Sequence, residues 1–134
     1  MKLRTLLIAG MALSVAGCTT TAALSTDPLS KRWVGVEAGK FFAAYGPPVS
    51  DEEAGSTTTY VWRGGYKTRR LPAQYEGEGK SKKQVARAQT QYLVCQVKLT
   101  VGDDYRIRTI TRMVDRPGAA GGPSWCEEFL DAAK

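Results

Sequence analysis

The sequence contains no histidine among its 134 residues. Histidine is the commonest general base and the commonest metal ligand in proteins, so its absence excludes most hydrolases and metalloproteins. We therefore expect no catalytic residue, no cofactor and no metal site. Long apolar runs are also missing, because the apolar segment 6–13 falls short of the roughly 20 residues that a membrane-spanning helix needs.

The first eighteen residues have the order of a bacterial export signal. Lys2 and Arg4 precede the apolar segment 6–13, and residues 15–18 read Val-Ala-Gly-Cys, with the small residues that signal peptidases require before the cut. This pattern resembles the lipobox of bacterial lipoproteins. The resemblance implies that residues 1–18 form a lipoprotein signal peptide and lipobox, and that Cys18 is the lipidation site and the membrane anchor.

The residue after the cysteine is Thr19, whereas an aspartate there typically retains a lipoprotein in the inner membrane of enteric bacteria. We expect a lipid-anchored protein on the periplasmic face of the outer membrane. Residues 19–30 are small and polar without a period, which predicts a flexible tether. The remaining residues, 31–134, are long enough for one small periplasmic domain, and the chain from Cys18 onward has a net charge of +4.

Cysteine is scarce, since only Cys95 and Cys126 are left once Cys18 is lipidated. An exported protein meets an oxidising compartment, so we expect these two to form a disulfide. Closing a loop of about 30 residues stabilises a fold by roughly 3 to 4 kcal/mol. The alternative, a reactive thiol, lacks both a Cys-x-x-Cys spacing and a histidine base.

Hydrophobic periodicity predicts an α+β fold. Val34, Ala38, Phe41 and Tyr45 recur at helical spacing, which predicts a helix of three to four turns that ends before Gly46 and two prolines. An acidic turn at 50–56 then leads to a strand at 57–62, rich in β-branched and aromatic residues, which Gly64 and Gly65 end or bend.

Two further strands and a helix follow. Residues 93–101 alternate apolar and polar side chains, and a loop at 102–104 leads to a partner strand over 105–114 with Tyr105, Ile107 and Met113 facing inward. Ile110 breaks the alternation, which predicts either a bulge near Thr109 or a sheet covered on both faces. Ser124 is a good N-cap for a helix over 125–132. The expected architecture is an N-terminal helix packed on an antiparallel sheet of about three strands, with a short disulfide-linked C-terminal helix.

Positive charge is concentrated between Arg63 and Arg87, where the local balance is +6 with two tyrosines interleaved. Residues 76–83 have the composition of an exposed mobile loop. Anionic lipid headgroups, lipopolysaccharide or an acidic envelope protein fit the expected compartment better than nucleic acid does. The alternative is a solvated loop without a ligand. The residues that we expect to form an anionic contact are Arg69, Arg70, Lys80, Lys82 and Lys83.

The order of these elements also resembles the SmpA/OmlA (BamE-like) family of small outer-membrane lipoproteins. The resemblance runs over roughly residues 33–114, through the helix end Tyr-Gly-Pro-Pro at 45–48, the strand around 60–62 and the Gly-Asp-Asp loop at 102–104. It implies a helical hairpin packed on a three-stranded antiparallel sheet and a role in β-barrel assembly.

The expected function is therefore that of a non-enzymatic, lipid-anchored envelope protein that supports outer-membrane organisation or assembly by binding a partner. A periplasmic inhibitor and a small enzyme acting on envelope polymers are the alternatives. The enzyme alternative depends on the adjacent acids at 51–53, 103–104 and 127–128, or on a dyad of Ser81 and Lys82, and such neighbouring side chains usually diverge into solvent.

Overall fold

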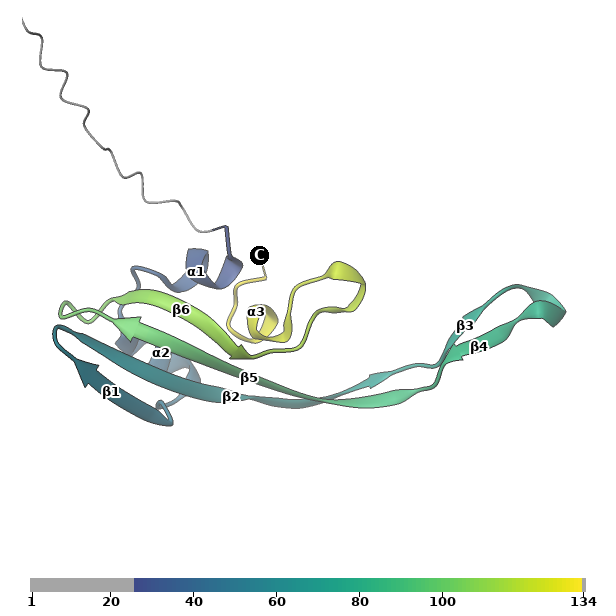
Figure 1. Cartoon of the computed structure of the whole chain (residues 1–134), viewed down its shortest axis with the longest axis horizontal. Helices are drawn as coiled ribbons and strands as arrows, with labels where there is room; N and C mark the ends of the chain where they lie inside the picture. Colours follow the sequence, from purple (N-terminus) through teal and green to yellow (C-terminus); the bar gives the residue numbers. More distant parts are fainter. Residues whose placement is uncertain (1–25, 134) are drawn as a thin grey trace, which may run out of the picture.

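The computed structural model describes residues 26–133. The predictions on the signal peptide, on Cys18 and on tether residues 19–25 lie outside this part of the chain. Strands make up most of the regular structure, and helices stand before and after them (Figure 1). In chain order the elements are α1 (Pro28–Trp33), α2 (Ala38–Tyr45), β1 (Ser50–Ala54), β2 (Thr57–Leu71), β3 (Gln74–Glu76), a 3-10 turn η1 (Gly79–Ser81), β4 (Lys83–Ala86), β5 (Gln89–Val101), β6 (Ile107–Val114), η2 (Ala119–Gly121) and α3 (Trp125–Phe129).

The main sheet is antiparallel and has four strands in the order β1-β2-β5-β6, where about three were predicted. The additional strand is β1, which occupies residues predicted as an acidic turn. All five β1 residues are exposed, and Asp51, Glu52 and Glu53 follow one another, so the strand lacks the apolar alternation that marks a half-buried strand. Charged side chains are typical of an edge strand, because they discourage pairing with other chains.

Two short helices replace the single helix predicted up to Tyr45. The end at Tyr45 is confirmed, with Gly46 at φ +98° after it. The break arises because residues 35–38 bond to the start of β6: the amides of Gly35 and Ala38 donate to the oxygens of Ile107 and Tyr105, at 2.8 and 2.9 Å. The helix α1 begins at Pro28 with Asp27 as its N-cap, so residues 28–30 belong to the folded domain and not to a tether.

The core lies between the helices and one face of the sheet, called here the inner face. The five predicted inward residues of β5 are confirmed, as all are buried: Leu93, Cys95, Val97, Leu99 and Val101. On β6 the buried residues are Ile107 and Ile110, whereas Tyr105 and Met113 are half exposed, contrary to prediction. The bulge predicted near Thr109 is present, since Thr109 pairs with Thr100 but Ile107 pairs with Val101. This extra residue keeps both isoleucines on the inner face.

Aromatic rings fill the core between α2 and β2. Phe41 has no exposed surface, and its ring meets those of Trp33 and Trp62 edge to face at centroid distances of 5.0 and 5.6 Å. The buried indole nitrogens also have partners, as Trp33 Nε1 donates to the Leu130 oxygen at 2.8 Å and Trp62 Nε1 to the Tyr45 oxygen at 3.3 Å. These bonds join the core to the ends of α3 and α2.

The C-terminal helix α3 has the predicted N-cap but is shorter than predicted. The Ser124 hydroxyl accepts from the Glu127 amide at 3.3 Å, and the Glu127 carboxylate accepts from the Ser124 amide at 3.0 Å. The helix ends at Phe129, because Leu130 leaves helical geometry and Asp131 has φ +56°. The predicted disulfide between Cys95 and Cys126 is confirmed, with a Cα–Cα distance of 5.1 Å.

The strands β2 and β5 continue well beyond the sheet as a two-stranded ribbon, so of the two predicted alternatives the strand does not end at Gly64 and Gly65. These glycines form a bulge, where the register shifts between Gly64 and Lys67. The predicted loop at 76–83 is also ordered, since β3 and β4 pair there and η1 closes their turn. The residues of this tip are exposed and polar, which explains why their composition indicated a loop.

Candidate functional site

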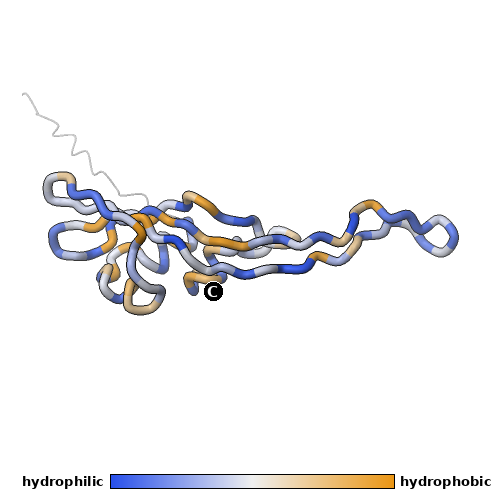
Figure 2. The backbone as a smooth tube through the Cα atoms, turned by 90° about the horizontal axis from the view of Figure 1, so that it is seen from below, coloured by the Kyte–Doolittle hydropathy of each residue, from blue (hydrophilic) through white to orange (hydrophobic). Residues whose placement is uncertain are grey.

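The most prominent feature outside the core is the two-stranded ribbon of residues 66–94, called here the arm (Figure 1). From Tyr66 to the turn at Gly79 it covers 13 residue steps, which correspond to at most about 43 Å at roughly 3.3 Å per residue. Neither β1 nor β6 pairs with this part of the ribbon, and its tip is mostly hydrophilic (Figure 2). Apart from its base, where Leu93 is buried, the arm is therefore mostly exposed to solvent.

Charge is divided between the arm and the rest of the molecule. The arm has seven Lys or Arg residues and two carboxylates, Glu76 and Glu78, so its net charge is +5. The other described residues, 26–65 and 95–133, contain nine Lys or Arg against eleven carboxylates, a net charge of −2. The excess positive charge of the folded domain therefore lies in the arm.

The five residues predicted as an anionic contact divide into two groups. Lys80, Lys82 and Lys83 lie together at the tip, where Lys82 Nζ is 5.3 Å from the centre of the Tyr75 ring. Arg69 and Arg70 lie on the ribbon and, as consecutive strand residues, on its opposite faces.

Arg69 is already engaged within the molecule. Its guanidinium donates to the Glu128 carboxylate on α3 at 3.3 Å, so an anionic ligand at Arg69 would compete with this carboxylate. For the other four, the structure records no ion pair among residues 26–133.

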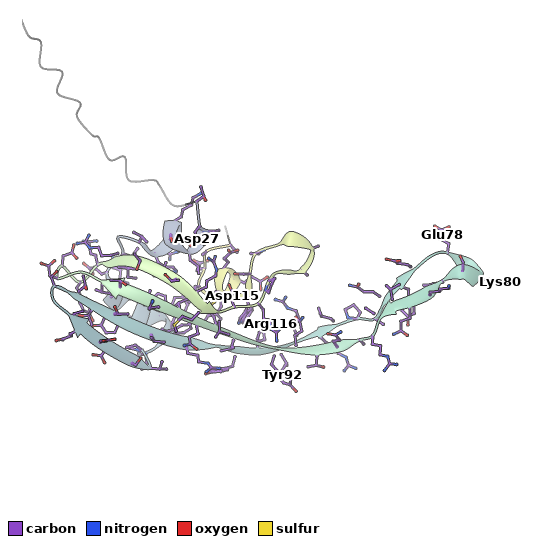
Figure 3. All side chains as sticks on the ribbon, in the orientation of Figure 1. Asp27, Glu78, Lys80, Tyr92, Asp115 and Arg116 are labelled. Carbon is purple, nitrogen blue, oxygen red and sulfur yellow. A yellow bond between two sulfur atoms is a disulfide. The ribbon has the colours of Figure 1, made fainter. Side chains whose placement is uncertain are left out.

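The outer face of the ribbon points away from the helices. Lys67 pairs with buried Leu93, so Tyr66 and Thr68, the neighbours of Lys67, lie on the opposite side. Tyr92 pairs with Thr68 on that same side, and Figure 3 shows it pointing away from Asp115 and Arg116. The two tyrosines are 72% and 74% exposed. The sequence showed Tyr66 among the cations, but only the strand register shows that Tyr92 shares its face.

The helix α3 braces the base of the arm at the bulge. The indole nitrogen of Trp125 donates to the Gly65 oxygen at 2.8 Å, and the Lys67 ammonium lies 5.5 Å from the centre of the Trp125 ring. Gly65 has φ +69°, and a Cβ placed there would come within 3.0 Å of the Phe129 ring. The glycine therefore permits both the bulge and the close approach of the helix.

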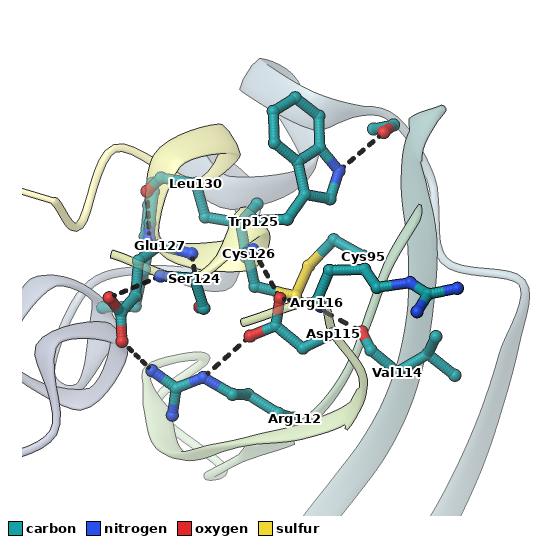
Figure 4. Close-up of a disulfide and its surroundings, with 12 residues drawn as sticks. Cys95, Arg112, Val114, Asp115, Arg116, Ser124, Trp125, Cys126, Glu127 and Leu130 are labelled. Atoms are coloured by element: carbon teal, nitrogen blue, oxygen red, sulfur yellow. Dashed lines mark hydrogen bonds and ion pairs between the residues drawn. A yellow bond between two sulfur atoms is a disulfide. The ribbon is translucent and has the colours of Figure 1, made fainter. Parts of the chain in front are cut away.

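A disulfide and an arginine hold α3 in this position (Figure 4). The disulfide joins the helix to β5 at the start of the arm. Arg112 on β6 contacts three carboxylates: Glu127 at 2.6 Å, Asp115 at 3.1 Å and Asp27. The arginine therefore connects the N-cap of α1, the end of β6 and the first turn of α3.

These ion pairs change the pKa values of two groups. Burial lowers the pKa of Arg112, but the hydrogen bond to Asp27 and the three carboxylates raise it more. Burial raises the pKa of Asp27, but the hydrogen bonds from Arg112 and Ser30 outweigh burial and lower it. Both groups therefore stay charged at neutral pH. No local sequence signal identified this cluster, because its members come from three separate segments.

A cleft of about 610 Å³ lies between α1 and the C-terminal segment. Lys31 and Arg32 line it on one side and Glu127 and Asp131 on the other. Arg32 lies 3.9 Å from Asp131 and Glu127 is bonded to Arg112, so both carboxylates of the cleft have a cationic partner. This arrangement does not favour a ligand of one charge sign.

Three of the acids considered for catalysis are paired with arginines. Asp104 pairs with Arg108 at 2.9 Å, and Glu127 and Glu128 bind Arg112 and Arg69. The Ser81 hydroxyl donates to the Glu78 oxygen at 2.7 Å instead of facing Lys82.

The described residues, 26–133, hold no group of three His, Cys, Asp or Glu side chains arranged to bind a metal ion. None of their helices has both the length and the apolar character needed to cross a membrane.

The fold and site define a strand-rich α+β protein with one disulfide and a projecting basic arm. Comparison of the chain with protein-family models, with curated proteins and with solved structures gives no match. Its function is therefore argued from its own residues.

Proposed function

We propose that this protein is a non-enzymatic, lipid-anchored envelope protein that supports outer-membrane organisation or assembly by binding a partner through its arm. The observation that carries the proposal is the arm itself. It is a ribbon of charge +5 that projects from a body of opposite net charge, and its cations apart from Arg69 have no carboxylate partner within the described chain.

Ordering a projecting ribbon costs more conformational entropy than its few contacts with the core offset. This imbalance supports a role for the ribbon in binding a partner. Its tip, residues 72–88, contributes no residue to the buried core, yet each ordered residue costs about 1–2 kcal/mol of backbone entropy. Solvated loops of the same composition need no paired strands. A contact surface does benefit from them, because preformed strands reduce the entropy lost on binding.

The anchor part of the proposal depends on the residues before the domain. The lipobox-like Val-Ala-Gly-Cys at 15–18 places the lipid on Cys18. Nine residue steps lead from Cys18 to the Asp27 cap of α1, a span of at most about 32 Å. The body is thus kept near the membrane, and an arm of similar length reaches partners beside it.

The resemblance to the SmpA/OmlA family supports the role in assembly. Two short helices precede the antiparallel strands, as that family's helical hairpin does. The fourth strand, the arm and the disulfide are additions to the pattern.

The proposal is tested in cells that express the chain naturally. Cys18→Ser should abolish lipidation and outer-membrane fractionation. A triple variant, K80Q/K82Q/K83Q, should leave the protein folded and anchored but reproduce the envelope permeability of a deletion strain. The matched control K31Q/K40Q/K98Q removes the same charge from the body and should behave as the wild type. Normal fractionation of the serine variant contradicts the anchor, and equal permeability of the two triple variants contradicts the role of the arm.

A further inference from the structure

Two exposed tyrosines and two arginines share the outer face at the base of the arm. We propose that this surface, defined as Arg63, Tyr66, Arg70, Tyr92 and Val94 and called here the outer arm face, is a docking surface for an acidic protein. This inference rests on the proposed partner binding and specifies which face binds and what kind of partner it binds.

The strand register places these residues side by side. Arg63 pairs with Gln96, Tyr92 with Thr68, and Arg70 with Thr90, all on the face that contributes nothing to the core. Val94 lies between Tyr92 and Gln96 on the same side and is half buried. The surface therefore has an aromatic and aliphatic centre with an arginine towards each end.

This composition is typical of a protein interface. Tyrosine and arginine are enriched among the residues that carry most of the binding energy at such interfaces, while lysine is depleted. A membrane-binding face instead combines lysine or arginine with tryptophan, phenylalanine or leucine, and none of these three apolar residues occurs on this surface. The arm lysines Lys80, Lys82 and Lys83 lie at the tip, apart from it.

The charge of the outer arm face indicates which kind of partner protein it binds. Neither Arg63 nor Arg70 forms an ion pair with any residue in the range 26–133. An acidic surface would satisfy both guanidinium groups, which bind carboxylates in a two-pronged geometry. The net charge of the arm would also speed the approach of an acidic partner and repel a basic one.

The surface is already rigid before it binds. Its residues stand on paired strands, and the ribbon is fixed at its base by the Trp125–Gly65 hydrogen bond and the Arg69–Glu128 ion pair. A tyrosine has only two side-chain torsions to fix, so little conformational entropy is lost when it is buried at an interface.

The test is site-specific photo-crosslinking of the full chain in its native cells. A photoreactive residue replaces Thr68, which lies beside both tyrosines, and a control replaces Thr111, which lies on the same side of the sheet but on β6. We expect a discrete protein adduct at position 68 and none at 111. The adduct should fall about tenfold or more in Y66A/Y92A and in R63Q/R70Q, and it should be unchanged in K31Q/K40Q.

The captured protein must also have an acidic surface, and its purified form should bind the full chain less tightly as salt rises. An adduct that persists in both double variants, a captured protein without acidic surface, or no adduct above the Thr111 control overturns the inference. Binding of the wild-type chain to phosphatidylglycerol vesicles that is lost in Y66A/Y92A would assign the face to lipid and overturn it as well. None of these outcomes affects the permeability result for the lysine tip, so the proposed function is judged separately.

Discussion

The indole nitrogen of Trp125 donates a hydrogen bond to the backbone oxygen of Gly65 at 2.8 Å, although the two residues are sixty positions apart in the chain. This bond ties the C-terminal helix to the bulge from which the arm leaves the body. The position of the C-terminal helix therefore affects the direction in which the arm leaves the body.

Replacing Trp125 by phenylalanine should loosen the arm at its base. The ring remains but the Gly65 oxygen loses its donor, which costs about 1–3 kcal/mol of unfolding free energy when the oxygen is left unpaired. Urea unfolding and amide hydrogen exchange measure the two effects, and exchange should rise in the arm strands next to the bulge. Trp33→Phe removes a bond of the same length, to Leu130, and should lower stability without a selective rise in the arm. Equal exchange patterns in the two variants would contradict the brace.

Alanine at Gly65 should destabilise the protein through both strain and contact. Its backbone has φ +69°, and the new Cβ would lie 3.0 Å from the Phe129 ring. We expect a loss of roughly 1–3 kcal/mol in unfolding free energy, measured by urea titration. Gly79→Ala is the control, because Gly79 also has positive φ but has no atom within 4 Å of its Cβ position. The control should strain only the tip, and a similar loss in both variants would count against the contact with Phe129.

Removing the disulfide should lower the free energy of unfolding by about 3–4 kcal/mol, since it closes a loop of 31 residues in the unfolded chain. The measurement compares C95A/C126A and reduced wild type with oxidised wild type in urea. Reduction leaves both sulfur atoms in place, so it separates the lost cross-link from the cavity that alanine creates. Two free thiols in protein purified without reductant would contradict the assignment.

Asp27 should make stability depend on pH at the acid end. Its pKa in the folded state lies below the ordinary value, because the hydrogen bonds from Arg112 and Ser30 outweigh the effect of burial. Its contribution is therefore complete above about pH 4, the ordinary range of an aspartate, and is lost as pH falls through the folded-state pKa.

Asp27→Asn tests this dependence. Asparagine keeps a good helix cap but removes the charge that faces Arg112. The variant should therefore have a lower free energy of unfolding at neutral pH. The acid limb of its stability curve, which is the loss of unfolding free energy as pH falls, should be flatter than that of the wild type. Urea unfolding from pH 7 to pH 3 measures the curve. Asp103→Asn removes one carboxylate from the exposed turn before β6 and should leave the acid limb unchanged. An acid limb in Asp27→Asn identical to that of the wild type would refute the prediction.

The sequence predicted those elements whose signals are local. The alternation from Leu93 to Val101 identified β5 and its inner face, and Ser124 with Glu127 identified the start of α3. The cysteine pairing followed from the count once Cys18 was assigned to the lipid. In each case the side chains that determine the structure are neighbours in the chain or have no alternative partner.

Elements that depend on distant partners could not be predicted in this way. The strand β1 is a strand because β2 pairs with it, and its own residues are charged. The helix break at 34–37 follows from bonds to Tyr105 and Ile107. Likewise, nothing near Arg69 indicates that Glu128 neutralises it, and nothing near Tyr66 indicates that Tyr92 shares its face.

Residues 70–91 of the arm contribute nothing to the core, which makes the length of the arm independent of core packing. Strand residues advance about 3.3 Å each and alternate between faces, so two residues added to both strands lengthen the arm by about 7 Å and keep every side chain on its face. The length of the ribbon can therefore change in fixed steps of two residues per strand. Paired insertions or deletions between the bulge and β3 can match it to a new separation between membrane and partner while the folded body stays as it is.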